Sequence, residues 1–545
     1  MKRWATTLPL LLLLGALVWP SAALGQGVTS ATIQGTILDE NEAPLPGANV
    51  VAVHEPSGSR YGTTTNERGA FTIANVRVGG PYTITVSFVG YQSKRETGLR
   101  LDLGESRDIS LQLRPKTQQL DEVQVVEERG AVFDEDRKGL STNISQEEVQ
   151  SAPTIDRSIA DFARFTPQAI VGNDDDDGSS ISIAGQNNRY NSIFIDGAVS
   201  NDVFGLSAQG TDGGQTGASP ISTDAIKSFN IEVSPYDVTQ SYFGGGAINA
   251  ITRSGTNQYK GSVAFEYRDQ NVTEDLPDGG FPDFTNERYV GRFGGPIVED
   301  ELFFFVNFDI NRESSPQPFQ STLGPDGDFQ GTAIQTQEDV NNLVSFLQNT
   351  VGDRYNPGGF RGQATTLDSD KFLGKIDWNI SQNHRLSARY SYSSSENVDA
   401  FGGGNSALSF SSRNEVFPNT TQIGALEVNS TFGNDYANKL ILSYKNVEDD
   451  RDTNLSQPFP TIDIFDGGAD ISLGGEPFST VNFLKQEVFT LTNDFNFFLG
   501  DHTVTVGTHN ELYDLANRFV PFNYGWYQFS DFLAGDNGTS MDEFA

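Results

Sequence analysis

The chain has 545 residues, enough for three or four domains at roughly 150 residues each, and its formal net charge is −36. This charge, from 72 acidic and 36 basic residues, excludes general binding to the phosphates of nucleic acids, and it is compatible with high solubility, cation binding or a salty medium. The absence of cysteine excludes disulfides, thiolate chemistry and a cysteine-linked lipid anchor.

The N-terminus is predicted to be a signal peptide, residues 1–25. Lys2 and Arg3 precede an apolar stretch at 8–19, which is shorter than the roughly 20 residues of a membrane-spanning helix. Small residues at 20–25 offer a cleavage site just before Gln26, and the alternative is an anchor helix. No later stretch is apolar enough to span a bilayer as a helix, so the exported chain would enter a membrane only as a β-barrel.

Residues 26–114 are predicted to form a small β-sandwich. Short strands separated by turn residues are expected at 31–38, 48–54, 70–74, 82–89 and 108–113. The strings GTILD (35–39), PLPGANV (44–50), GAF (69–71) and VGY (89–91) resemble the carboxypeptidase-regulatory-like domain that many outer-membrane receptors of the Bacteroidetes type carry in front. The resemblance implies a non-catalytic, transthyretin-like sandwich, either a packing and spacing module or a glycan-binding one.

Residues 115–130 are predicted to be a linker. It carries three valines at extended spacing beside two acids, which fits either one more edge strand or a docking segment. In TonB-dependent receptors a segment of this kind lies before the plug, and this one resembles the TonB box. The resemblance implies binding to a TonB-type energy-coupling protein, by addition of a strand to the partner's sheet. The candidate box is Leu120, Asp121, Glu122, Val123, Gln124, Val125 and Val126.

Residues 131–256 are predicted to form a mixed α/β domain. Ser145 and Glu148 form a capping-box pattern, and Ile155, Ile159 and Phe162 recur at helical spacing and should face a core. The strings IFIDG (193–197), IEV (231–233) and GGGAIN (244–249), with DAI at 224–226, resemble the plug domain of TonB-dependent outer-membrane receptors. The plug-motif residues are Arg189, Asp196, Gly197, Gly244, Gly245, Gly246 and Asn249.

The stretch 224–261 separates the small modules at the start of the chain from the long, aromatic-rich alternating strands that follow. Strands are expected at 229–233 and 247–252, with a turn at 254–257. In the string RLSARYSY (385–392), Leu386 and Tyr390 would face lipid while Arg385 and Arg389 face the lumen of a barrel. Nine such alternating strands follow the stretch, at 259–268, 287–294, 302–311, 371–380, 385–393, 422–432, 438–445, 487–497 and 502–511.

These strands predict part of a transmembrane β-barrel, residues 257–545, because a soluble sandwich would have short turns at regular spacing. The string GPIVEDELFFF (295–305) gives a strand, a tight turn and a strand, and it resembles the first hairpins of the Oar-like receptor subgroup. Polar inserts at 313–370 and 446–484 are expected to be long extracellular loops. Plugged barrels have about 22 strands, so we expect an N-terminal fragment of a longer receptor; the alternative is a complete barrel of about eight or ten strands.

No catalytic, cofactor or metal site is predicted with a full set of residues. His502 and His509 point to opposite faces of one strand, and His509 with Glu511 supplies only two ligands. The acidic run at 173–177 resembles the opening of a calcium loop. Asp175 and Asp177 are its candidate ligands, but Ala184 stands where the bidentate glutamate belongs.

Together the resemblances imply a mainly β outer-membrane receptor that imports an unidentified ligand by energy-coupled movement of a plug, with no enzymatic activity and no cofactor. The implied partners are outer-membrane lipid, a TonB-type energy-coupling protein, an extracellular ligand and, optionally, a surface lipoprotein. The sandwich and the candidate box would lie in the periplasm of a Gram-negative cell. The alternatives are a surface adhesion or protein-export component with the same architecture, and a secreted glycan-binding protein led by the sandwich.

Overall fold

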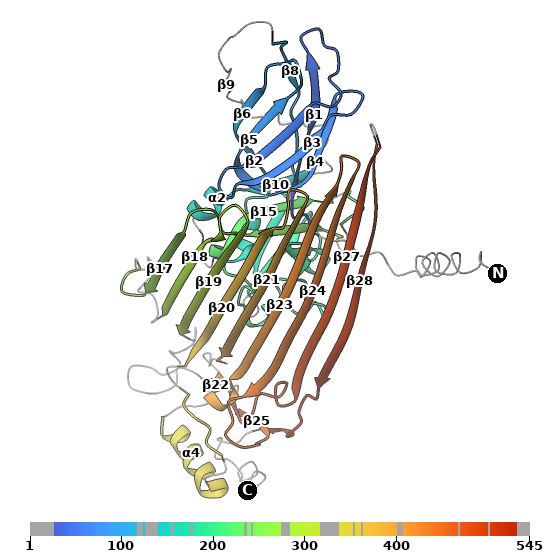
Figure 1. Ribbon diagram of the computed structural model, residues 1–545. Helices are drawn as coiled ribbons and strands as arrows, with labels where there is room; N and C mark the ends of the chain where they lie inside the picture. Colours follow the sequence, from blue (N-terminus) through green and yellow to red (C-terminus); the bar gives the residue numbers. More distant parts are fainter. Residues whose placement is uncertain are drawn as a thin grey trace, which may run out of the picture.

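The computed structural model describes residues 27–116, 124–125, 140–152, 154, 157–174, 178–233, 237–240, 244–273, 284–316, 337–352, 355–360, 363–400, 407–466, 469–499 and 502–530. Most of these residues lie in strands, as the sequence predicts. The sandwich comes first along the long axis of the molecule, then a central domain beside a sheet of long strands, and at the far end a small domain with helix α4 (Figure 1).

The sandwich consists of two facing sheets. Their strand orders are β4-β1-β7 and β3-β2-β5-β6-β9, with β8 beside β1. Alternate side chains of β1, such as Ile33 and Ile37, are buried between the sheets, which is the pattern that predicts this strand. The bounds are β1 Ala31–Asp39, β2 Asn49–His54, β3 Ser59–Thr64, β4 Ala70–Val76, β5 Gly79–Ser87, β6 Lys94–Leu101, β7 Ser106–Asp108, β8 Leu111–Leu113 and β9 Gln124–Val125.

The structure adds strands β3 and β6 to those that the sequence predicts in the sandwich. Strand β3 buries Ser59, Tyr61 and Thr63, two of which are polar, so no apolar alternation marks it. Strand β6 escapes prediction for the same reason: charged residues make up half of its sequence, KRETGLRL, so it shows no apolar alternation. The strand predicted at 108–113 is replaced by two short strands, β7 and β8, that pair with β1 in parallel.

The central domain, residues 140–252, is a mixed α/β domain as predicted. Its five-stranded sheet has the order β10-β15-β16-β13-β14, and Phe162 of α3 stacks on Phe229 of β15 with ring centroids 5.0 Å apart. The capping box of Ser145 and Glu148 is confirmed. The bounds are β10 Leu140–Ile144, α2 Gln146–Ser151, α3 Ile159–Ala163, β11 Ala169–Asp174, β12 Gly178–Ile183, η1 Asn188–Tyr190, β13 Ser192–Ile195, β14 Ala198–Val199, η2 Gly214–Thr216, η3 Thr223–Ala225, β15 Ile226–Val233 and β16 Gly246–Thr252.

The two strands predicted at the end of the central domain are confirmed as β15 and β16. They pair antiparallel, and every residue of β16 is buried. The predicted helix is shorter than its apolar spacing indicates, because α3 begins only after its cap at Ser158; Ile155 lies outside the described residues. After β16 the chain is irregular, with a bend at 257–258 in place of the turn predicted at 254–257, and it then enters the long strands.

The nine predicted long strands are all present and form one antiparallel sheet in chain order, from β17 to β28. Most extend past their predicted bounds, because polar residues at the strand ends hide the apolar alternation. We call this the nine-stranded sheet. Its bounds are β17 Lys260–Asp269, β18 Thr285–Val298, β19 Leu302–Pro316, β20 Ala364–Asn379, β21 His384–Asp399, β23 Glu415–Phe432, β24 Tyr436–Thr453, β27 Asn482–Leu499 and β28 His502–Phe519.

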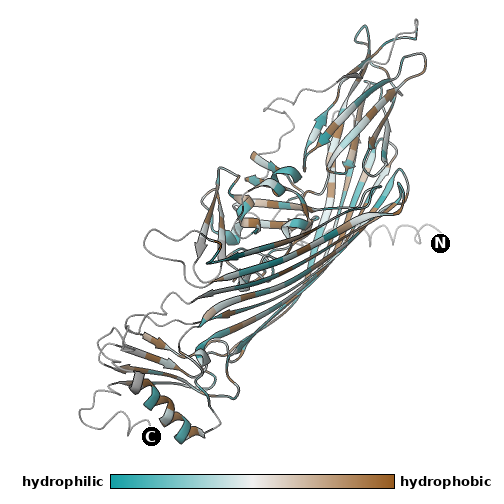
Figure 2. Cartoon of the chain, turned by 90° about the vertical axis from the view of Figure 1, so that its left-hand side faces the viewer, coloured by the Kyte–Doolittle hydropathy of each residue, from teal (hydrophilic) through white to brown (hydrophobic). Residues whose placement is uncertain are grey.

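The two faces of the nine-stranded sheet differ in chemistry. On β21, Arg389 is buried toward the central domain, whereas its neighbour Tyr390 is 44% exposed on the opposite face. On β19 the buried Asp309 follows the exposed Phe308 in the same way. Hydrophilic and hydrophobic residues alternate along the strands in Figure 2. The predicted division of β21 into two faces is therefore confirmed, with the central domain on the polar side.

The predicted loops at the far end are more structured than their polar composition indicates. Helix α4 (Gln337–Val351) packs on a four-stranded sheet in the order β22-β26-β25-β29, and the core joins Leu343 and Leu347 of α4 to Phe410 and Ile464. No single loop has enough apolar residues to predict a hydrophobic core. The core forms only where several loops pack together. Within the described ranges, no helix is long and apolar enough to cross a bilayer. The bounds are β22 Ala407–Ser409, η5 Ser411–Arg413, β25 Thr461–Asp466, β26 Ala469–Leu473 and β29 Trp526–Ser530.

Replacing Leu347 by alanine tests whether this small domain is a packed unit. The side chain is fully buried, so Leu347→Ala should destabilise the domain by about 2–5 kcal/mol. Limited proteolysis of the detergent-solubilised protein should then cut the small domain faster and leave the sandwich intact. The exposed Gln348→Ala is the matched control and should not change the cleavage rate. Equal cleavage rates for both variants would contradict a packed core.

Candidate functional site

Asp196 occupies a tight turn where the central domain meets the nine-stranded sheet. The turn joins β13 to β14, and both Asp196 (φ 47°) and Gly197 (φ 74°) have left-handed backbone conformations. An Asp-Gly hairpin turn of this kind needs positive φ at both central residues, which explains the sequence here. The turn directs the Asp196 side chain into the junction, where the residue is only 8% exposed.

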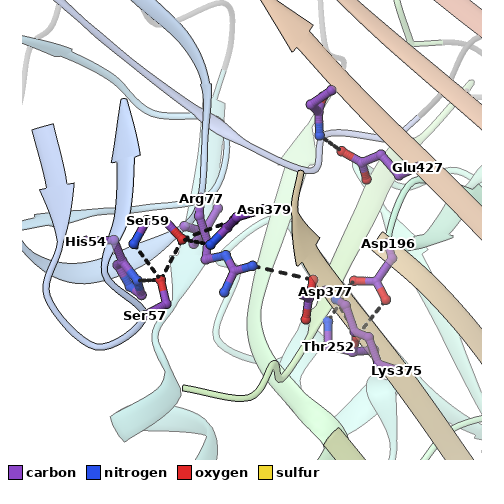
Figure 3. A network of polar contacts seen from close by, with 12 residues as sticks. His54, Ser57, Ser59, Arg77, Asp196, Thr252, Lys375, Asp377, Asn379 and Glu427 are labelled. Atoms are coloured by element: carbon purple, nitrogen blue, oxygen red, sulfur yellow. Dashed lines mark hydrogen bonds and ion pairs between the residues drawn. The ribbon is translucent and has the colours of Figure 1, made fainter. Parts of the chain in front are cut away.

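The Asp196 carboxylate joins strands from both domains. Its Oδ1 accepts a hydrogen bond from the backbone N–H of Thr252 at the end of β16 (2.9 Å), and Oδ2 accepts one from the Thr252 hydroxyl (2.6 Å). Lys375 Nζ of β20 lies 3.3 Å from Oδ1, and Arg389 Nε of β21 lies 3.4 Å from Oδ2. We call Asp196, Thr252, Lys375 and Arg389 the Asp196 latch; Figure 3 shows the first three.

The partners of Asp196 offset the cost of burying its charge. Burial opposes ionisation, but Lys375, Arg389 and the hydrogen bonds from Thr252 together hold the pKa of this carboxyl below its usual value. Removing the carboxylate would leave both cations buried without it, which is costly in a medium of low polarity. The attachment of the central domain to β20 and β21 therefore depends strongly on one side chain.

Other polar pairs attach further parts of the central domain to the sheet. Lys445 Nζ of β24 donates to Asp212 Oδ1 at 2.8 Å, and burial raises the pKa of Asp212 to about 6 although Lys445 opposes this shift. The hydroxyls of Thr216 and of Ser395 on β21 are 2.8 Å apart. The central domain is thus held at several points along the polar face, and most strongly where charges are paired.

A cavity of about 80 Å³ lies where the sandwich, the central domain and the sheet meet. Arg77 of the sandwich lies 3.5 Å from Asp377 of β20, and Lys227 of β15 donates to the carbonyl of Val78 (Figure 3 shows the first pair). Burial, together with the nearby cations of Arg77 and Lys375, lowers the pKa of Lys227 to about 7. All three domains therefore bring buried charge to this junction.

A chain of hydrogen bonds links His54 of the sandwich to the sheet. His54 Nδ1 and Ser57 Oγ are 2.6 Å apart, the hydroxyls of Ser57 and Ser59 are 2.8 Å apart, and Asn379 Nδ2 donates to Ser59 at 3.0 Å (Figure 3). Burial lowers the pKa of His54 to about 2, so the imidazole is neutral near pH 7. His54 is a buried structural residue of the sandwich.

The structure places the plug-motif residues at different points of the central domain. Asp196 and Gly197 form the turn of the latch. Asn249 lies in β16 and accepts a hydrogen bond from the backbone N–H of Val28 of the sandwich (3.0 Å). Arg189 is exposed on the short helix η1 and takes no part in the latch.

The glycines of the plug motif bring backbone segments close together. The N–H groups of Gly244 and Gly245 both donate to the carbonyl of Tyr190, at 2.8 and 3.0 Å. Gly246 begins β16, and a Cβ added there would lie 2.7 Å from the carbonyl oxygen of Glu232. The close backbone approach that the glycines predict is thus present at Gly246.

Most of the candidate TonB box lies outside the described residues. Of residues 120–126, only Gln124 and Val125 are described; they form β9, which pairs in parallel with Arg95 and Glu96 of β6. This pairing fits the first of the two interpretations of the segment, an additional edge strand. It leaves the docking role a prediction.

The calcium candidates Asp175 and Asp177 lie outside the described residues, as does the predicted signal peptide, so the calcium loop stays a prediction. His509 Nε2 lies 2.8 Å from Glu511 Oε1, so these two residues share a face as expected. Among the described residues, no three histidine or acidic side chains gather where they could hold a metal ion.

Two of the four latch residues could be found from the sequence, which places Arg389 on the lumen face and Asp196 in the plug motif. The sequence did not point to Lys375 or Thr252 as functional residues, nor to Lys227 and Arg77 of the neighbouring junction. A partial signal exists for Lys375, because a basic residue that is buried on a strand face needs acidic groups or backbone carbonyls around it. The partner itself cannot be read from the sequence, since Lys375 and Asp196 are 179 positions apart.

Three sequence profiles of known domains match the chain. The carboxypeptidase regulatory-like domain matches residues 32–114, and the TonB-dependent receptor plug domain matches residues 135–251. The outer membrane beta barrel domain matches residues 251–545, which is more than half of the chain.

Known proteins resemble the chain over part of their length. The TonB-dependent transporter Oar of Myxococcus xanthus is 25% identical over 390 residues, which cover 68% of this chain and 34% of Oar. The outer membrane transporter YddB from Escherichia coli (13% identity, TM-score 0.49) is matched over 73% of this chain and 50% of that one. A mutant of the ferric enterobactin receptor PfeA from Pseudomonas aeruginosa (14%, TM-score 0.45) is matched over 69% and 49%. The chain thus spans about a third of the length of the curated relative that it matches.

Removing the charge of Asp196 tests the latch. Asp196→Asn leaves Lys375 and Arg389 buried without their carboxylate, so the attachment should weaken by about 3–5 kcal/mol. Amide hydrogen exchange of β16, measured by mass spectrometry, should become much faster. The control Glu147→Gln removes a carboxylate that is exposed 3.7 Å from Arg100, and it should not change the exchange. Equal exchange in both variants would contradict the latch.

The shifted pKa of Lys227 predicts a pH dependence. Between about pH 7 and the usual pKa of 10.5, the unfolded chain holds one proton more at this residue than the folded chain, so folding stability should rise with pH. The slope is at most about 1.4 kcal/mol per pH unit. Thermal unfolding in detergent should show that Lys227→Met loses this slope, whereas the exposed Lys116→Met keeps it. If the stability of Lys227→Met still rises with pH as in the unchanged protein, the pH dependence does not come from Lys227 and the prediction is wrong.

Proposed function

Because the chain belongs to the TonB-dependent receptor family of outer-membrane β-barrel proteins, we propose that it imports a ligand across the outer membrane by energy-coupled movement of its plug. The central domain is the plug, and the nine-stranded sheet is part of the barrel. The ligand would pass through the lumen without any covalent change. The proposed function is therefore transport and not enzymatic catalysis.

The observation that carries this proposal is the Asp196 latch. The plug is attached to barrel strands β20 and β21 through one carboxylate that faces Lys375 and Arg389. A buried ion pair is favourable only when its charges keep good geometry, and separating them inside the protein leaves buried charges without a partner. The plug is therefore either attached to the barrel through this pair or fully detached from it. A plug that opens under a pull and returns to the same place needs an attachment of this kind.

The ends of the strands support an orientation in the outer membrane. Short turns join the strands at the sandwich end, such as residues 433–435 between β23 and β24, whereas the connections at the other end reach the small domain. Outer-membrane barrels have short periplasmic turns and longer extracellular loops. The sandwich and the candidate box would lie in the periplasm, and the small domain would lie outside the cell.

The proposal implies a set of partners and a division of the chain. A TonB-type energy-coupling protein would bind residues 120–126 by strand addition, and an extracellular ligand, with or without a surface lipoprotein, would bind at the opposite end. The division is a signal peptide at 1–25, the sandwich at 26–114, the linker at 115–130, the plug at 131–256 and the barrel at 257–545.

A surface adhesion or protein-export component with the same architecture is the second candidate. The small extracellular domain favours it, because it is a packed unit with the large side chains of Phe465, Trp526 and Tyr527 exposed. Exposed aromatic side chains are typical of surfaces that bind another macromolecule. Such a protein would hold its partner without importing a nutrient.

Deleting residues 120–126 separates the two candidates. Energised cells that express the protein should deplete at least one compound from a medium of oligosaccharides, peptides and ferric siderophores, measured by mass spectrometry. The deletion should abolish this depletion, because the pull no longer reaches the plug. Deletion of residues 127–133 removes the same number of residues from the connection between the sandwich and β10 and is the matched control. Depletion that persists without 120–126 would contradict energy-coupled import, and binding to the cell surface without any depletion would favour adhesion.

A further inference from the structure

The sandwich is bound to the periplasmic turns of the barrel. Asn434, in the turn between β23 and β24, accepts hydrogen bonds from the Thr63 hydroxyl (3.0 Å) and from the backbone N–H of Thr64 (3.2 Å). At the end of β20, Asn379 donates to Ser59 of the sandwich at 3.0 Å. The sandwich therefore contacts two separate turns of the barrel wall.

Charged residues of the barrel extend this contact. The guanidinium of Arg385 on β21 lies 3.6 Å from the ring centroid of Tyr61, and it also donates to the carbonyl of Arg60 (2.9 Å). Glu427 of β23 accepts a hydrogen bond from the hydroxyl of Thr29 at 3.0 Å. With the Arg77–Asp377 pair, these contacts connect the sandwich to β20, β21 and β23.

The sandwich also covers plug strands β15 and β16. Asn230 of β15 donates to the carbonyl of Leu103 (3.4 Å), and Asn249 of β16 accepts from the backbone N–H of Val28 (3.0 Å). Ile251 of β16 shares a small apolar cluster with Leu103 and Val28. The sandwich thus lies on the plug as well as on the barrel.

The contact surface of the sandwich is mostly polar. Among the described residues, the apolar cluster between sandwich and plug contains only Val28, Val78, Leu103 and Ile251. The apolar core of the sandwich lies between its own two sheets and does not depend on the plug or the barrel. An interface of this composition can open and close while both domains stay folded, as is usual for contacts between domains.

The candidate box lies on the chain path between the sandwich and the plug. Strand β8 of the sandwich ends at Leu113, the plug begins with β10 at Leu140, and residues 120–126 lie between them. Strand β9, inside the candidate box, pairs with β6 of the sandwich. A pull on the box therefore acts on the sandwich as well as on the plug.

We propose that the sandwich is a lid on the periplasmic mouth of the barrel, which has to leave the barrel turns before the plug can open. This inference rests on the proposed function, because it presupposes a plug that moves. While the lid is docked it covers β15 and β16 and is tied to barrel strands, so the plug cannot shift toward the periplasm without displacing it. A pull on the box, which is paired with the sandwich, first lifts the lid and then acts on the Asp196 latch.

Introduced cysteines can report the docking of the lid, because the chain has no cysteine of its own. Each pair replaces two side chains that are hydrogen-bonded in the structure. The sandwich–barrel pair is Ser59→Cys with Asn379→Cys, the plug–barrel pair is Thr216→Cys with Ser395→Cys, and the control pair inside the sandwich is Thr36→Cys with Ser110→Cys.

The yield of cross-linking by a short bis-methanethiosulfonate reagent is compared in energised cells and in cells treated with a protonophore. In energised cells the yield of the sandwich–barrel pair should fall several-fold. It should recover with the protonophore or when residues 120–126 are deleted, while the control pair stays constant. Cross-linking the sandwich–barrel pair beforehand should stop the energy-dependent change of the plug–barrel pair, and reductant should restore that change.

The outcomes distinguish the lid from the transport function. An energy-dependent change of the plug–barrel pair without one of the sandwich–barrel pair would overturn the lid and leave the proposed function standing. A sandwich–barrel cross-link that does not affect the plug–barrel pair would overturn the lid as well. If neither pair responds to energisation, the proposed function fails, and the lid fails with it.

Discussion

A buried carboxylate must be paired, and at Asp196 this requirement determines how the plug lies against the barrel wall. The Asp-Gly turn fixes where the carboxylate projects, because both residues adopt the left-handed backbone conformation. Its partners then come from three other strands: Thr252 from β16, Lys375 from β20 and Arg389 from β21. A local turn thereby aligns the last strand of the plug with two strands of the barrel wall. The polar face of the nine-stranded sheet is the face that binds the plug.

The plug and the sandwich are attached by interactions of different strength. The plug has the nearly buried Asp196 latch, and its apolar core also includes Phe305 and Leu373 of the barrel. The sandwich is held to the barrel mostly by partly exposed hydrogen bonds, such as those at Asn434, and by one largely buried ion pair, Arg77–Asp377. Exposed polar contacts contribute little to stability, whereas buried ion pairs are costly to break. The plug adds an apolar core shared with the barrel to its ion pairs, so in the lid proposal the sandwich is the weaker of the two attachments.

More of the fold than of the candidate site could be predicted from the sequence. Nine long strands are visible in the sequence because each alternates apolar and polar residues along the part that crosses the membrane. Strand β3 is hidden because it buries Ser59 and Thr63, and the small domain is hidden because its core, including Leu347 and Ile464, is divided among distant loops. At the latch, the turn at Asp196 is recognisable and Lys375 lies in a predicted strand, but the partner of Lys375 is not recognisable, and the buried Lys227 carries no local signal.

The sequence by itself determined what depends on near neighbours: the strands and their faces, the capping box at Ser145, and the Asp-Gly turn, since periodicity and backbone sterics act over a few residues. Only the tertiary structure decided which charges meet. Lys375 reaches Asp196 across 179 positions, and Asn379 reaches Ser59 across 320. Such pairs depend on the register of the whole sheet and on the docking of separate domains, and no local preference of the chain encodes either of these.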